Sequence, residues 1–405
     1  MEQKLVITKQ EDKIISAFFE GRDMVQVSVN AAQEEGILGN IYLGKVKNIV
    51  KNINAAFVEI ADGRMCYYSM SENPCPIMAN ASVGQSPRGK EGAIKAGDEL
   101  IVQVIKEDIK TKAPVVSSNI NLTGKYIALT YGKTTLGVSS KIEDEKERQR
   151  LKDILKRQEK KDCGFIIRTN AAYTSEEIIL KELRGLKAIY EHIRTYGVHQ
   201  SRFSLLYSTP PNYICDIRDG YADNVDQFIT DDPELYGHIK EYLENYQSED
   251  IGKLKLYEDK TLSLSNLYGI NEKLKDALKP LVWLKSGGSL IIQPTEALTV
   301  IDVNTGKAVT GKKKVQETFL KVNREAAKEI AKQIRLRNLS GIIIIDFIDM
   351  ELKKNKELLM EELESYFKLD PVKTTLVDMT ALGLVEVTRK KVRKPLYEQI
   401  REFGV

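Results

Sequence analysis

The sequence has few of the residues on which redox, zinc and histidine chemistry depend. Its 405 residues include four cysteines, with no Cys-x-x-Cys pair, and three histidines. Cysteines placed in this way predict neither a zinc knuckle nor a redox dithiol, and a reducing, cytoplasmic location is expected. Histidine-dependent catalysis is not expected either, so any metal would need oxygen ligands.

Long apolar runs and a strong charge of one sign are also missing. No run approaches the length of a membrane span, and the N-terminus lacks the order of a signal peptide. The 61 Lys and Arg residues nearly balance the 58 Asp and Glu residues, so the overall charge neither demands nor excludes a nucleic-acid partner. The composition is that of an ordinary globular protein with roughly two to three domains.

Short strands separated by turn signals occupy the first third of the chain. Three alternating segments within 1–35 are too few to bury a core alone, so we expect them to join a later part of the chain. Asp62 and Gly63 separate two further strands and are a strong signal for a two-residue hairpin. Five short strands within about 80 residues predict a small closed barrel, for which an OB-fold is the natural candidate.

The last part of the chain alternates strands with helices. This alternation indicates a layered α/β domain. The segment 216–279, by contrast, gives no clear pattern. The expected strands are 289–293, 298–303, 341–347 and 374–378, and the expected helices are 315–337 and 355–367.

Two of these apolar strands end in carboxylates. Asp302 lies at the end of one strand, two residues before Asn304, and Asp346 lies at the end of another. Buried strands that end together can place such side chains at one sheet edge, where α/β ligand sites lie. Two close carboxylates repel each other unless a cation neutralises them, and Mg²⁺ prefers oxygen ligands. The pattern favours a Mg²⁺ site over the alternative, in which each aspartate only caps the loop or helix that follows it.

A second interpretation exists for the segment that follows Asn304. Residues 306–313 nearly match the phosphate-binding P-loop pattern. The final Ser or Thr of that pattern, which would bind Mg²⁺, is Lys313 here, so an NTPase is the weaker alternative. A loop rich in glycine and lysine also suits contact with an RNA backbone, or it is simply a solvated basic loop.

Aromatic residues on the expected barrel are candidates for RNA contact. Phe57, Tyr67 and Tyr68 lie on adjacent strands, and Lys112 is near them in the sequence. Aromatic rings stack on single-stranded bases, while lysines hold phosphates. Because side chains alternate along a strand, Tyr67 and Tyr68 point to opposite faces, and at least one of them is expected to belong to the core.

Several segments together resemble the bacterial ribonuclease E/G family of endoribonucleases, and the resemblance runs through almost the whole chain. The segments that carry it are Gly39-Asn-Ile-Tyr-Leu-Gly-Lys-Val, Ala55-Ala-Phe-Val-Glu, Leu122-Thr-Gly-Lys-Tyr, Gly164-Phe-Ile-Ile-Arg-Thr, Ser286-Gly-Gly-Ser-Leu-Ile-Ile, Thr295-Glu-Ala-Leu-Thr-Val-Ile-Asp-Val-Asn, Gln333-Ile-Arg-Leu-Arg, Gly341-Ile-Ile-Ile-Ile-Asp-Phe-Ile-Asp-Met and Gly383-Leu-Val-Glu-Val-Thr-Arg-Lys. The pair of strands that carries the two aspartates is the most specific part of the match.

The resemblance implies a multidomain architecture of the α+β and α/β classes. An RNase H-like subdomain would be split between residues 1–35 and 216–279. Two parts would be inserted in it: an OB-fold RNA-binding domain at 36–119 and a 5′-phosphate sensor subdomain at 120–215. A DNase-I-like catalytic domain would follow at 280–400.

The resemblance also implies an activity, Mg²⁺-dependent endoribonucleolytic cleavage of single-stranded RNA. Such an enzyme acts in RNA processing, rRNA processing included, and in RNA decay, and it leaves 5′-phosphate and 3′-hydroxyl ends. Asp302 and Asp346 would bind Mg²⁺, with Asn304 as the third catalytic residue. The implied pocket for a 5′-monophosphate consists of Gly124, Ala128, Arg168, Thr169 and Lys373, and the implied barrel contacts to RNA are Phe57, Tyr67 and Lys112.

The sequence departs from the family pattern in three places. Tyr67 stands where Phe is usual, which preserves stacking. Lys373 stands where Arg is usual, and a lysine keeps the charge but loses the bidentate fork, so weaker 5′-end sensing is expected. Family members usually continue into a Cys-Pro-x-Cys zinc link between subunits and a small domain, and the sequence ends at Val405 without them. A homodimer or tetramer would then lack its zinc link, and a catalytically weak RNA-binding protein stays open as the alternative.

Overall fold

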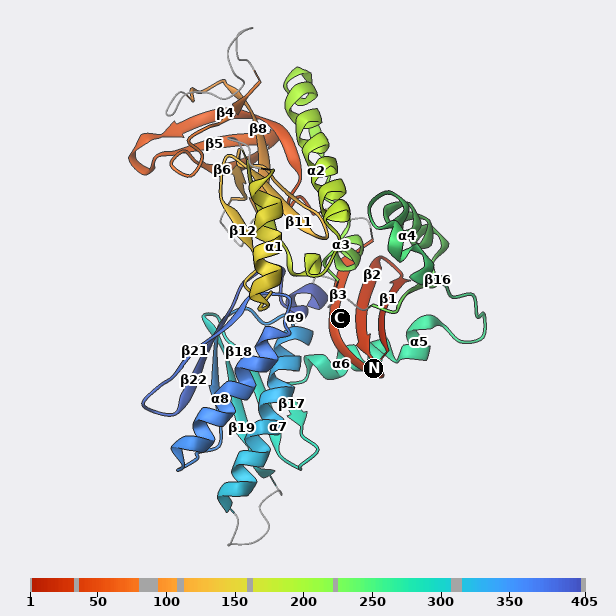
Figure 1. The fold of residues 1–405 in the computed structure, drawn as a ribbon, viewed down its shortest axis with the longest axis vertical. Coiled ribbons are helices and arrows are strands. Elements are labelled where there is room, and N and C mark those ends of the chain that lie inside the picture. Colours follow the sequence, from red (N-terminus) through yellow and green to blue (C-terminus); the bar gives the residue numbers. More distant parts are fainter. Residues whose placement is uncertain are drawn as a thin grey trace. The chain divides into compact units, whose positions relative to one another are not determined.

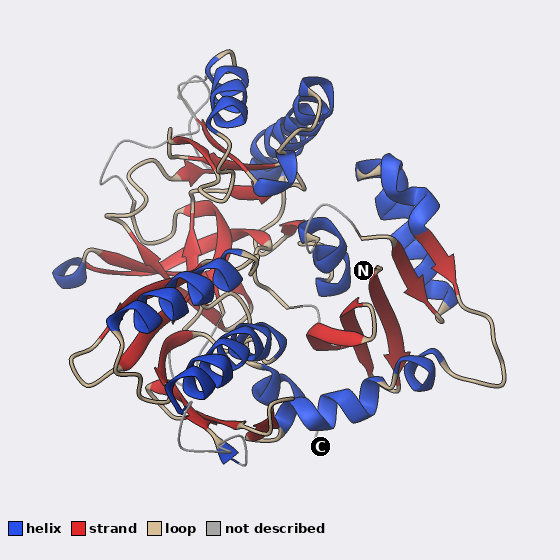
Figure 2. Ribbon diagram, turned by 60° about the horizontal axis from the view of Figure 1, so that its bottom comes forward, coloured by secondary structure: helices blue, strands red, loops and turns tan. Residues whose placement is uncertain are grey.

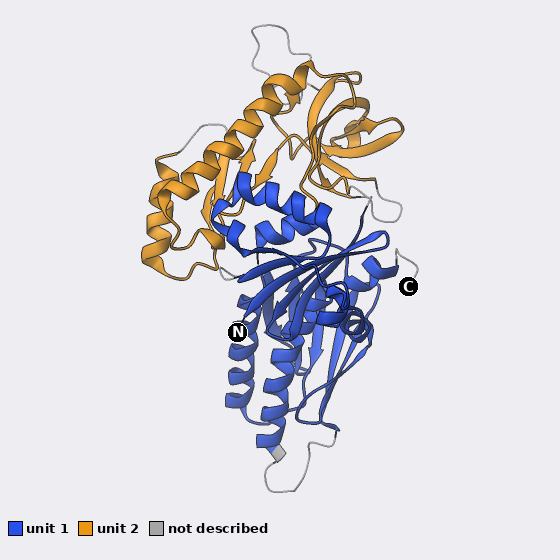
Figure 3. Ribbon diagram, turned by 90° about the vertical axis from the view of Figure 1, so that its right-hand side faces the viewer, with its two compact units in different colours: residues 1–34, 212–405 blue, residues 35–211 orange. Residues whose placement is uncertain are grey.

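The structure is a computed structural model (Figure 1), in which strands and helices are mixed along the chain (Figure 2). It divides into two compact units (Figure 3). Unit 1 comprises residues 1–34 and 212–405, and unit 2 comprises residues 35–211. The residues that the structure describes are 2–32, 36–79, 94–107, 113–158, 163–220, 225–306 and 315–401.

The first sheet of unit 1 joins the start of the chain to its middle. Its strands are, in order, β16 (Leu254–Leu256), β15 (Gln227–Thr230), β1 (Gln3–Gln10), β2 (Lys13–Glu20) and β3 (Asp23–Ala31). β1 runs parallel to β15, with Val6 opposite Ile229, and antiparallel to β2. The expectation that the first three strands join a later part of the chain is therefore confirmed.

Helices cover both faces of this first sheet. Side chains that alternate along β1 enter different cores: Val6 belongs to one, and Leu5 and Ile7 to the other. The first core takes side chains from α5 (Leu264–Tyr268), α6 (Ile270–Leu278), α9 (Leu396–Arg401) and the last residue of α7 (Val315–Leu336). The helices of the second core are α3 (Asn212–Asp219) and α4 (Pro233–Tyr246). Burial on both faces removes the polar–apolar alternation that marks a half-buried strand.

The second sheet of unit 1 has one face covered by two helices. Its strands are, in order, β17 (Leu281–Trp283), β18 (Ser289–Pro294), β19 (Leu298–Asn304), β20 (Gly341–Asp346), β22 (Leu384–Arg389) and β21 (Thr374–Met379). Helices α7 (Val315–Leu336) and α8 (Lys353–Lys368) lie side by side on it (Figure 1). Ile301 and Ile345 are buried beneath these helices, whereas their neighbours Asp302 and Asp346 are not. We call the side that carries the two aspartates the carboxylate face.

Unit 2 contains a small closed barrel. The barrel order is β4–β5–β6–β9–β8, and β8 pairs back with β4 to close the ring. Asp62 and Gly63 form the turn between β5 and β6, and Gly63 has the positive φ of 75° that such a turn requires. The closed five-stranded barrel agrees with the expected OB-like fold. Its strands are β4 (Ile41–Val50), β5 (Ala55–Ala61), β6 (Arg64–Ser69), β8 (Glu99–Lys106) and β9 (Val115–Ser117).

A four-stranded sheet with two helices completes unit 2. Its strand order is β10 (Asn121–Thr123), β11 (Ile127–Tyr131), β13 (Cys163–Ile167) and β12 (Leu136–Val138). Helices α1 (Glu145–Lys156) and α2 (Glu176–Tyr196) share one apolar core with this sheet. In the part of the chain that the structure describes, no helix is both long and apolar enough to span a membrane.

A buried ion pair ties the end of β22 to the segment after α8. The Arg389 Nε donates to the Asp370 Oδ2 at 2.7 Å, and the two side chains are only 2% and 4% exposed. Arg389 also donates to the Asn338 side chain and to the carbonyl of Leu339, just before β20. One guanidinium therefore holds together three segments at this end of the sheet.

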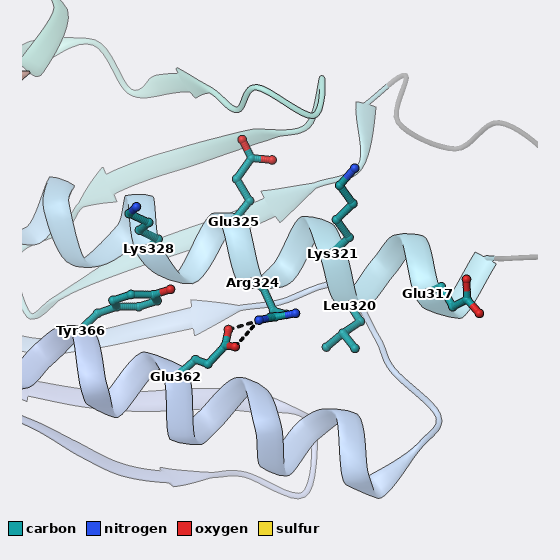
Figure 4. Close-up of a pocket in the computed structure, with 8 residues that line it drawn as sticks. All are labelled: Glu317, Leu320, Lys321, Arg324, Glu325, Lys328, Glu362 and Tyr366. Atoms are coloured by element: carbon teal, nitrogen blue, oxygen red, sulfur yellow. Dashed lines mark hydrogen bonds and ion pairs between the residues drawn. The ribbon is translucent and has the colours of Figure 1, made fainter.

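We expect Arg389→Met to lower the free energy of unfolding by about 3–5 kcal/mol, because Asp370 would stay buried without its partner. The matched control is Arg324→Met, since Arg324 on α7 pairs with Glu362 at the surface (Figure 4). Such surface pairs contribute less than about 1 kcal/mol. Urea unfolding followed by circular dichroism measures both variants, and equal losses would contradict the expectation.

Candidate active site

The two aspartates that the sequence singles out are direct neighbours in the second sheet of unit 1. β19 and β20 run parallel, and Asp302 is in register with Asp346. Register partners on neighbouring strands lie about 4.8 Å apart and present their side chains on the same face. Asp302 is half-buried and Asp346 is exposed. The expected juxtaposition of the two carboxylates is present, and their role as metal ligands stays a prediction.

Asn304 holds the carboxylate of Asp302. It lies two residues further along β19, on the same face, and its Nδ2 donates to the Asp302 Oδ2 at 2.6 Å. This hydrogen bond fixes the direction of one carboxylate oxygen and leaves the other oxygen for a further ligand. The sequence prediction that Asn304 lies beside Asp302 is confirmed, while its catalytic role stays untested.

The electrostatics of the pair favour a cation. Although Asp346 is exposed, partial loss of water around its carboxylate raises its pKa above the ordinary value, and the charges of Asp302 and Asp349 raise this pKa further. A divalent cation between Asp302 and Asp346 would remove their mutual repulsion, and two carboxylates with water suit Mg²⁺. Among the described residues, no group of three or more His, Cys, Asp or Glu could hold a metal ion.

Asn323 on α7 holds the backbone that follows Asp346. It is completely buried; its Oδ1 accepts from the N–H of Ile348 at 3.1 Å, and its Nδ2 donates to the carbonyl of Ile348 at 2.8 Å. Ile348 lies between Asp346 and Asp349, so the two hydrogen bonds fix the segment that carries the second carboxylate. The sequence prediction did not include Asn323. A polar residue next to the apolar Val322, on the core side of an amphipathic helix, is the signal that points to it.

A surface pocket lies between α7 and α8 (Figure 4). It is lined by Glu317, Leu320, Lys321, Arg324, Glu325, Lys328, Glu362 and Tyr366. Arg324 and Glu362 form an ion pair within it, and the other charges are of both signs. These helices cover the side of the sheet opposite the carboxylate face, so the pocket is separate from the aspartate pair. Its mixed charges single out no ligand.

Two of the residues expected to bind a 5′-monophosphate lie at one end of the four-stranded sheet of unit 2. The Arg168 Nη1 donates to the carbonyl of Gly124 at 2.6 Å. Thr169 follows directly, and its hydroxyl forms a 3.0 Å hydrogen bond with the hydroxyl of Ser139. Guanidinium and hydroxyl groups are both donors that can bind a phosphate. Ser139 was not among the predicted residues, because it is 30 positions away in the sequence.

The backbone near this expected pocket is held by a carboxylate. The Glu182 side chain on α2 accepts the backbone N–H groups of residues 125–127 at 2.6–2.8 Å. Burial raises the pKa of Glu182, although these hydrogen bonds and the charge of Arg168 oppose the shift. A Cβ at position 124 would collide with this carboxylate, which explains Gly124. A phosphate here would therefore depend on the side chains of Arg168 and Thr169.

Ala128 and Lys373 are the other two residues expected at the 5′-monophosphate pocket. Ala128 is half-buried on β11, opposite Ile166 on β13. Lys373 belongs to unit 1, where it is exposed just before β21. The roles of both residues in 5′-end binding stay predictions.

The aromatic residues of the barrel divide between the core and the outside. Phe57 and Tyr67 are register partners, with their ring centroids 6.3 Å apart in an edge-to-face arrangement, and both are half-buried. Tyr68 is completely buried, and its hydroxyl donates to Ser118 at 3.2 Å; burial raises its pKa to about 12. The expectation that one of the two adjacent tyrosines belongs to the core is confirmed.

Two sequence predictions fall outside the described residues. Lys112, expected to contact RNA, is one of them. Of the segment that nearly matches a P-loop, only Gly306 is described, and residues 307–313 are not. The backbone of Gly306 lies against the carbonyl of Gly287, where a Cβ would not fit.

Comparison with known proteins identifies the family. Residues 121–392 match the model of the Ribonuclease E/G family. Ribonuclease G of Haemophilus influenzae is 33% identical over 396 residues, which span 96% of this chain and 79% of the relative. Ribonuclease E of Synechocystis sp. is 33% identical over 398 residues, 98% of this chain and 58% of the relative. Ribonuclease G of Escherichia coli K12 is 32% identical over 397 residues, 96% of this chain and 80% of the relative.

An OB-like barrel and a pair of facing carboxylates in one chain suit an enzyme that hydrolyses nucleic acid. The matches make this class specific: the chain belongs to the ribonuclease E/G family. It is an endoribonuclease, a hydrolase that acts on RNA. Both the family and the enzyme class that the sequence resemblance implied are confirmed.

We expect Asn323→Leu to slow RNA cleavage about 10- to 100-fold, because a small displacement of Asp346 is enough to lose that much rate. The variant also leaves the backbone of Ile348 without its buried partners, which costs about 1–3 kcal/mol of stability per group. Single-turnover cleavage with saturating RNA measures the rate, and thermal unfolding measures the stability.

The control for this variant is Gln333→Leu. Gln333 is another buried amide on α7, but it bonds to Glu329 and Arg337 rather than to the segment after β20. Its loss is expected to lower stability and leave the cleavage rate of the folded protein within about twofold, well below the effect of a displaced carboxylate. Equal rate losses in the two variants would contradict the role given to Asn323.

Proposed function

We propose that the chain cleaves single-stranded RNA by hydrolysis at the pair Asp302 and Asp346, with Mg²⁺ as the cofactor. The observation that carries the proposal is the register of β19 and β20, which sets the two carboxylates side by side on one face. Asn304 supports it, because its hydrogen bond orients Asp302. Membership in a family of endoribonucleases that act in RNA processing agrees with it.

The proposed chemistry is attack of water on the scissile phosphate. Bound Mg²⁺ supplies a Lewis acid that activates water and neutralises charge on the phosphate. Asp302 and Asp346 would hold this ion, and Asn304 would keep Asp302 directed at it. When the bond from phosphorus to the 3′ oxygen breaks, the products carry a 5′-phosphate and a 3′-hydroxyl.

We also propose that unit 2 binds the RNA. Phe57 and Tyr67 present half-buried rings side by side on the barrel, and such rings stack on unpaired bases irrespective of sequence. Lys112 would hold a neighbouring phosphate. In this proposal residues 36–119 are the RNA-binding domain and residues 280–400 are the DNase-I-like catalytic domain.

The subdomain that combines the start and the middle of the chain has support from the first sheet of unit 1. β1, β2 and β3 from residues 1–35 share this sheet with β15 and β16 from residues 216–279. We propose that it is the RNase H-like subdomain, and that residues 120–215 form the 5′-sensor subdomain.

The proposed 5′-sensor uses the guanidinium of Arg168. Its tether to the carbonyl of Gly124 and the hydrogen bond between Thr169 and Ser139 support a phosphate site at this place. Ala128 and Lys373 complete the proposed set. A lysine at position 373 offers charge without the bidentate geometry of an arginine, so we propose moderate discrimination of the 5′ end.

We expect Asp346→Asn to abolish cleavage of a short A/U-rich RNA while RNA affinity stays within about threefold, since loss of metal assistance removes rate rather than uniform binding. The control is Asp378→Asn, which changes an exposed aspartate of the same sheet, on β21 opposite Glu386. Cleavage assays with Mg²⁺ or with EDTA measure the difference. An active Asp346→Asn protein would overturn the proposal, and a wild-type protein that binds RNA without cutting would point to the RNA-binding alternative.

We expect Arg168→Ala to remove most of the preference for 5′-monophosphate over 5′-hydroxyl RNA, because its guanidinium is the group in the proposed pocket that can bind a phosphate in bidentate fashion. The rate on 5′-hydroxyl RNA should stay unchanged. Arg157→Ala is the control, because Arg157 is an exposed arginine of unit 2 that pairs with Glu176. Ratios of kcat/KM for the two RNAs measure the preference, and an unchanged ratio in Arg168→Ala would remove Arg168 from the pocket.

A further inference from the structure

Trp283 is the single tryptophan of the chain, and it is conspicuously exposed. It ends β17, where 69% of its surface is accessible, and Leu281 on the same strand is 41% accessible. Val282, between them, packs into the core beneath α7 and α8. Because side chains alternate along a strand, β17 presents Leu281 and Trp283 to the carboxylate face. A tryptophan normally hides most of its large apolar surface, so this exposure calls for a partner.

The sheet register places Trp283 in line with the proposed catalytic residues. Trp283 is opposite Ser289 on β18, and Ser289 is opposite Asn304 on β19. Two strand spacings separate the Cα atoms of Trp283 and Asn304 by roughly 10 Å. One step along the same strands, Ile291 lies between Leu281 and Asp302. The exposed ring therefore lies on the same face of the sheet as the carboxylate pair, two strands from β19 and three from β20.

The loop after Trp283 is fastened to the strand that carries Asn304. Gly288 approaches the carbonyl of Asn304 so closely that a Cβ would lie 2.8 Å from it. The carboxylate of Glu325 on α7 accepts the backbone N–H groups of Lys285 and Ser286, at 2.6 and 3.1 Å. These contacts fix the end of β17 relative to β19, so the ring is presented from a rigid base rather than from a free loop.

The distribution of charge on the carboxylate face favours a polyanion on the β18 and β17 side of the aspartate pair rather than on the β22 and β21 side. On the far side, Glu386 on β22 and Asp378 on β21 are register partners and would repel phosphate. On the near side, the described strands β17 and β18 carry no acidic residue on this face, and Lys285 follows β17 as an exposed residue. The residues of β17 and β18 on this face are Leu281, Trp283, Ser289, Ile291 and Gln293.

We propose that Trp283 is a base-stacking subsite for the single-stranded RNA strand that leaves the carboxylate pair over β18 and β17. The inference rests on the proposed function, because it takes RNA as the substrate of that pair. A tryptophan face accepts any base, so the subsite holds the strand in place without reading its sequence. The span of roughly 10 Å from Asn304 is one that a short stretch of single-stranded RNA bridges.

The sole tryptophan makes the experiment direct, because the intrinsic tryptophan fluorescence of the whole chain reports on Trp283 alone. A short A/U-rich RNA is titrated into the full chain in EDTA, so that the RNA stays intact. Stacking is expected to quench the emission with the same midpoint as RNA binding measured independently by fluorescence anisotropy of labelled RNA.

Substitutions of Trp283 test whether an aromatic ring at this position contributes to RNA affinity. Trp283→Ala is expected to weaken RNA binding about 5- to 150-fold, the range that corresponds to loss of one base–aromatic stack, and Trp283→Phe should restore most of the affinity. The control is Tyr246→Ala, which removes a similarly exposed ring, 61% accessible, from α4 outside the second sheet of unit 1. That variant should bind RNA as the wild type does.

Three results would overturn the inference. One is unchanged emission when RNA binds, and another is equal affinity of Trp283→Ala and wild type. The third is a shift of oligomeric state in Trp283→Ala on size-exclusion chromatography with unchanged RNA affinity, because a second copy of the chain would then be what covers the ring.

The outcomes also separate this inference from the proposed function. If Asp346→Asn abolishes cleavage while the Trp283 variants bind RNA normally, the proposed function stands and only the subsite fails. If the wild type cuts no RNA, the proposed function fails, and the titration still decides whether RNA stacks on Trp283.

Discussion

The parallel register of β19 and β20 is the constraint on which the candidate site depends, because it sets the like charges of Asp302 and Asp346 side by side. β19 and β20 are locked in register because their alternate residues, such as Ile301 and Ile345, are buried under α7 and α8. A slip by one residue would expose those side chains and bury the carboxylates, so the two charges cannot move apart. Partial desolvation and the neighbouring charges of Asp302 and Asp349 raise the pKa of Asp346. A divalent cation is the simplest group that relieves this fixed repulsion.

Polar side chains on helices then fix the backbone at both candidate sites. Asn323 uses its donor and its acceptor on Ile348, and the carboxylate of Glu182 takes the N–H groups of residues 125–127. In each case a side chain on a helix forms hydrogen bonds with the backbone of a loop segment and restrains it. Fixing these segments keeps Asp346 and the tether of Arg168 in place before any ligand arrives, which reduces the ordering required on binding.

Short sequence patterns predicted those parts of the structure that depend on residues close together in the chain, such as strands and turns. The apolar strands that end in Asp302 and Asp346 predicted the carboxylate pair, and Asp62 with Gly63 predicted the hairpin of the barrel. The segment 216–279 escaped prediction because β15 is buried on both faces. Its adjacent Phe228 and Ile229 enter different cores, so no alternation marks the strand.

Asn323 and Glu182 were not predicted from the sequence because their hydrogen-bond partners lie 25 and 55–57 residues away, and no sequence period encodes such distant hydrogen bonds.

The central claim is that Asp302 and Asp346 together hold one divalent cation, and Mn²⁺ binding followed by electron paramagnetic resonance tests it most directly. The account predicts one Mn²⁺ per chain that Mg²⁺ displaces, and loss of this binding in Asp302→Asn with the fold intact. Equal Mn²⁺ binding by Asp302→Asn and the wild type would contradict it.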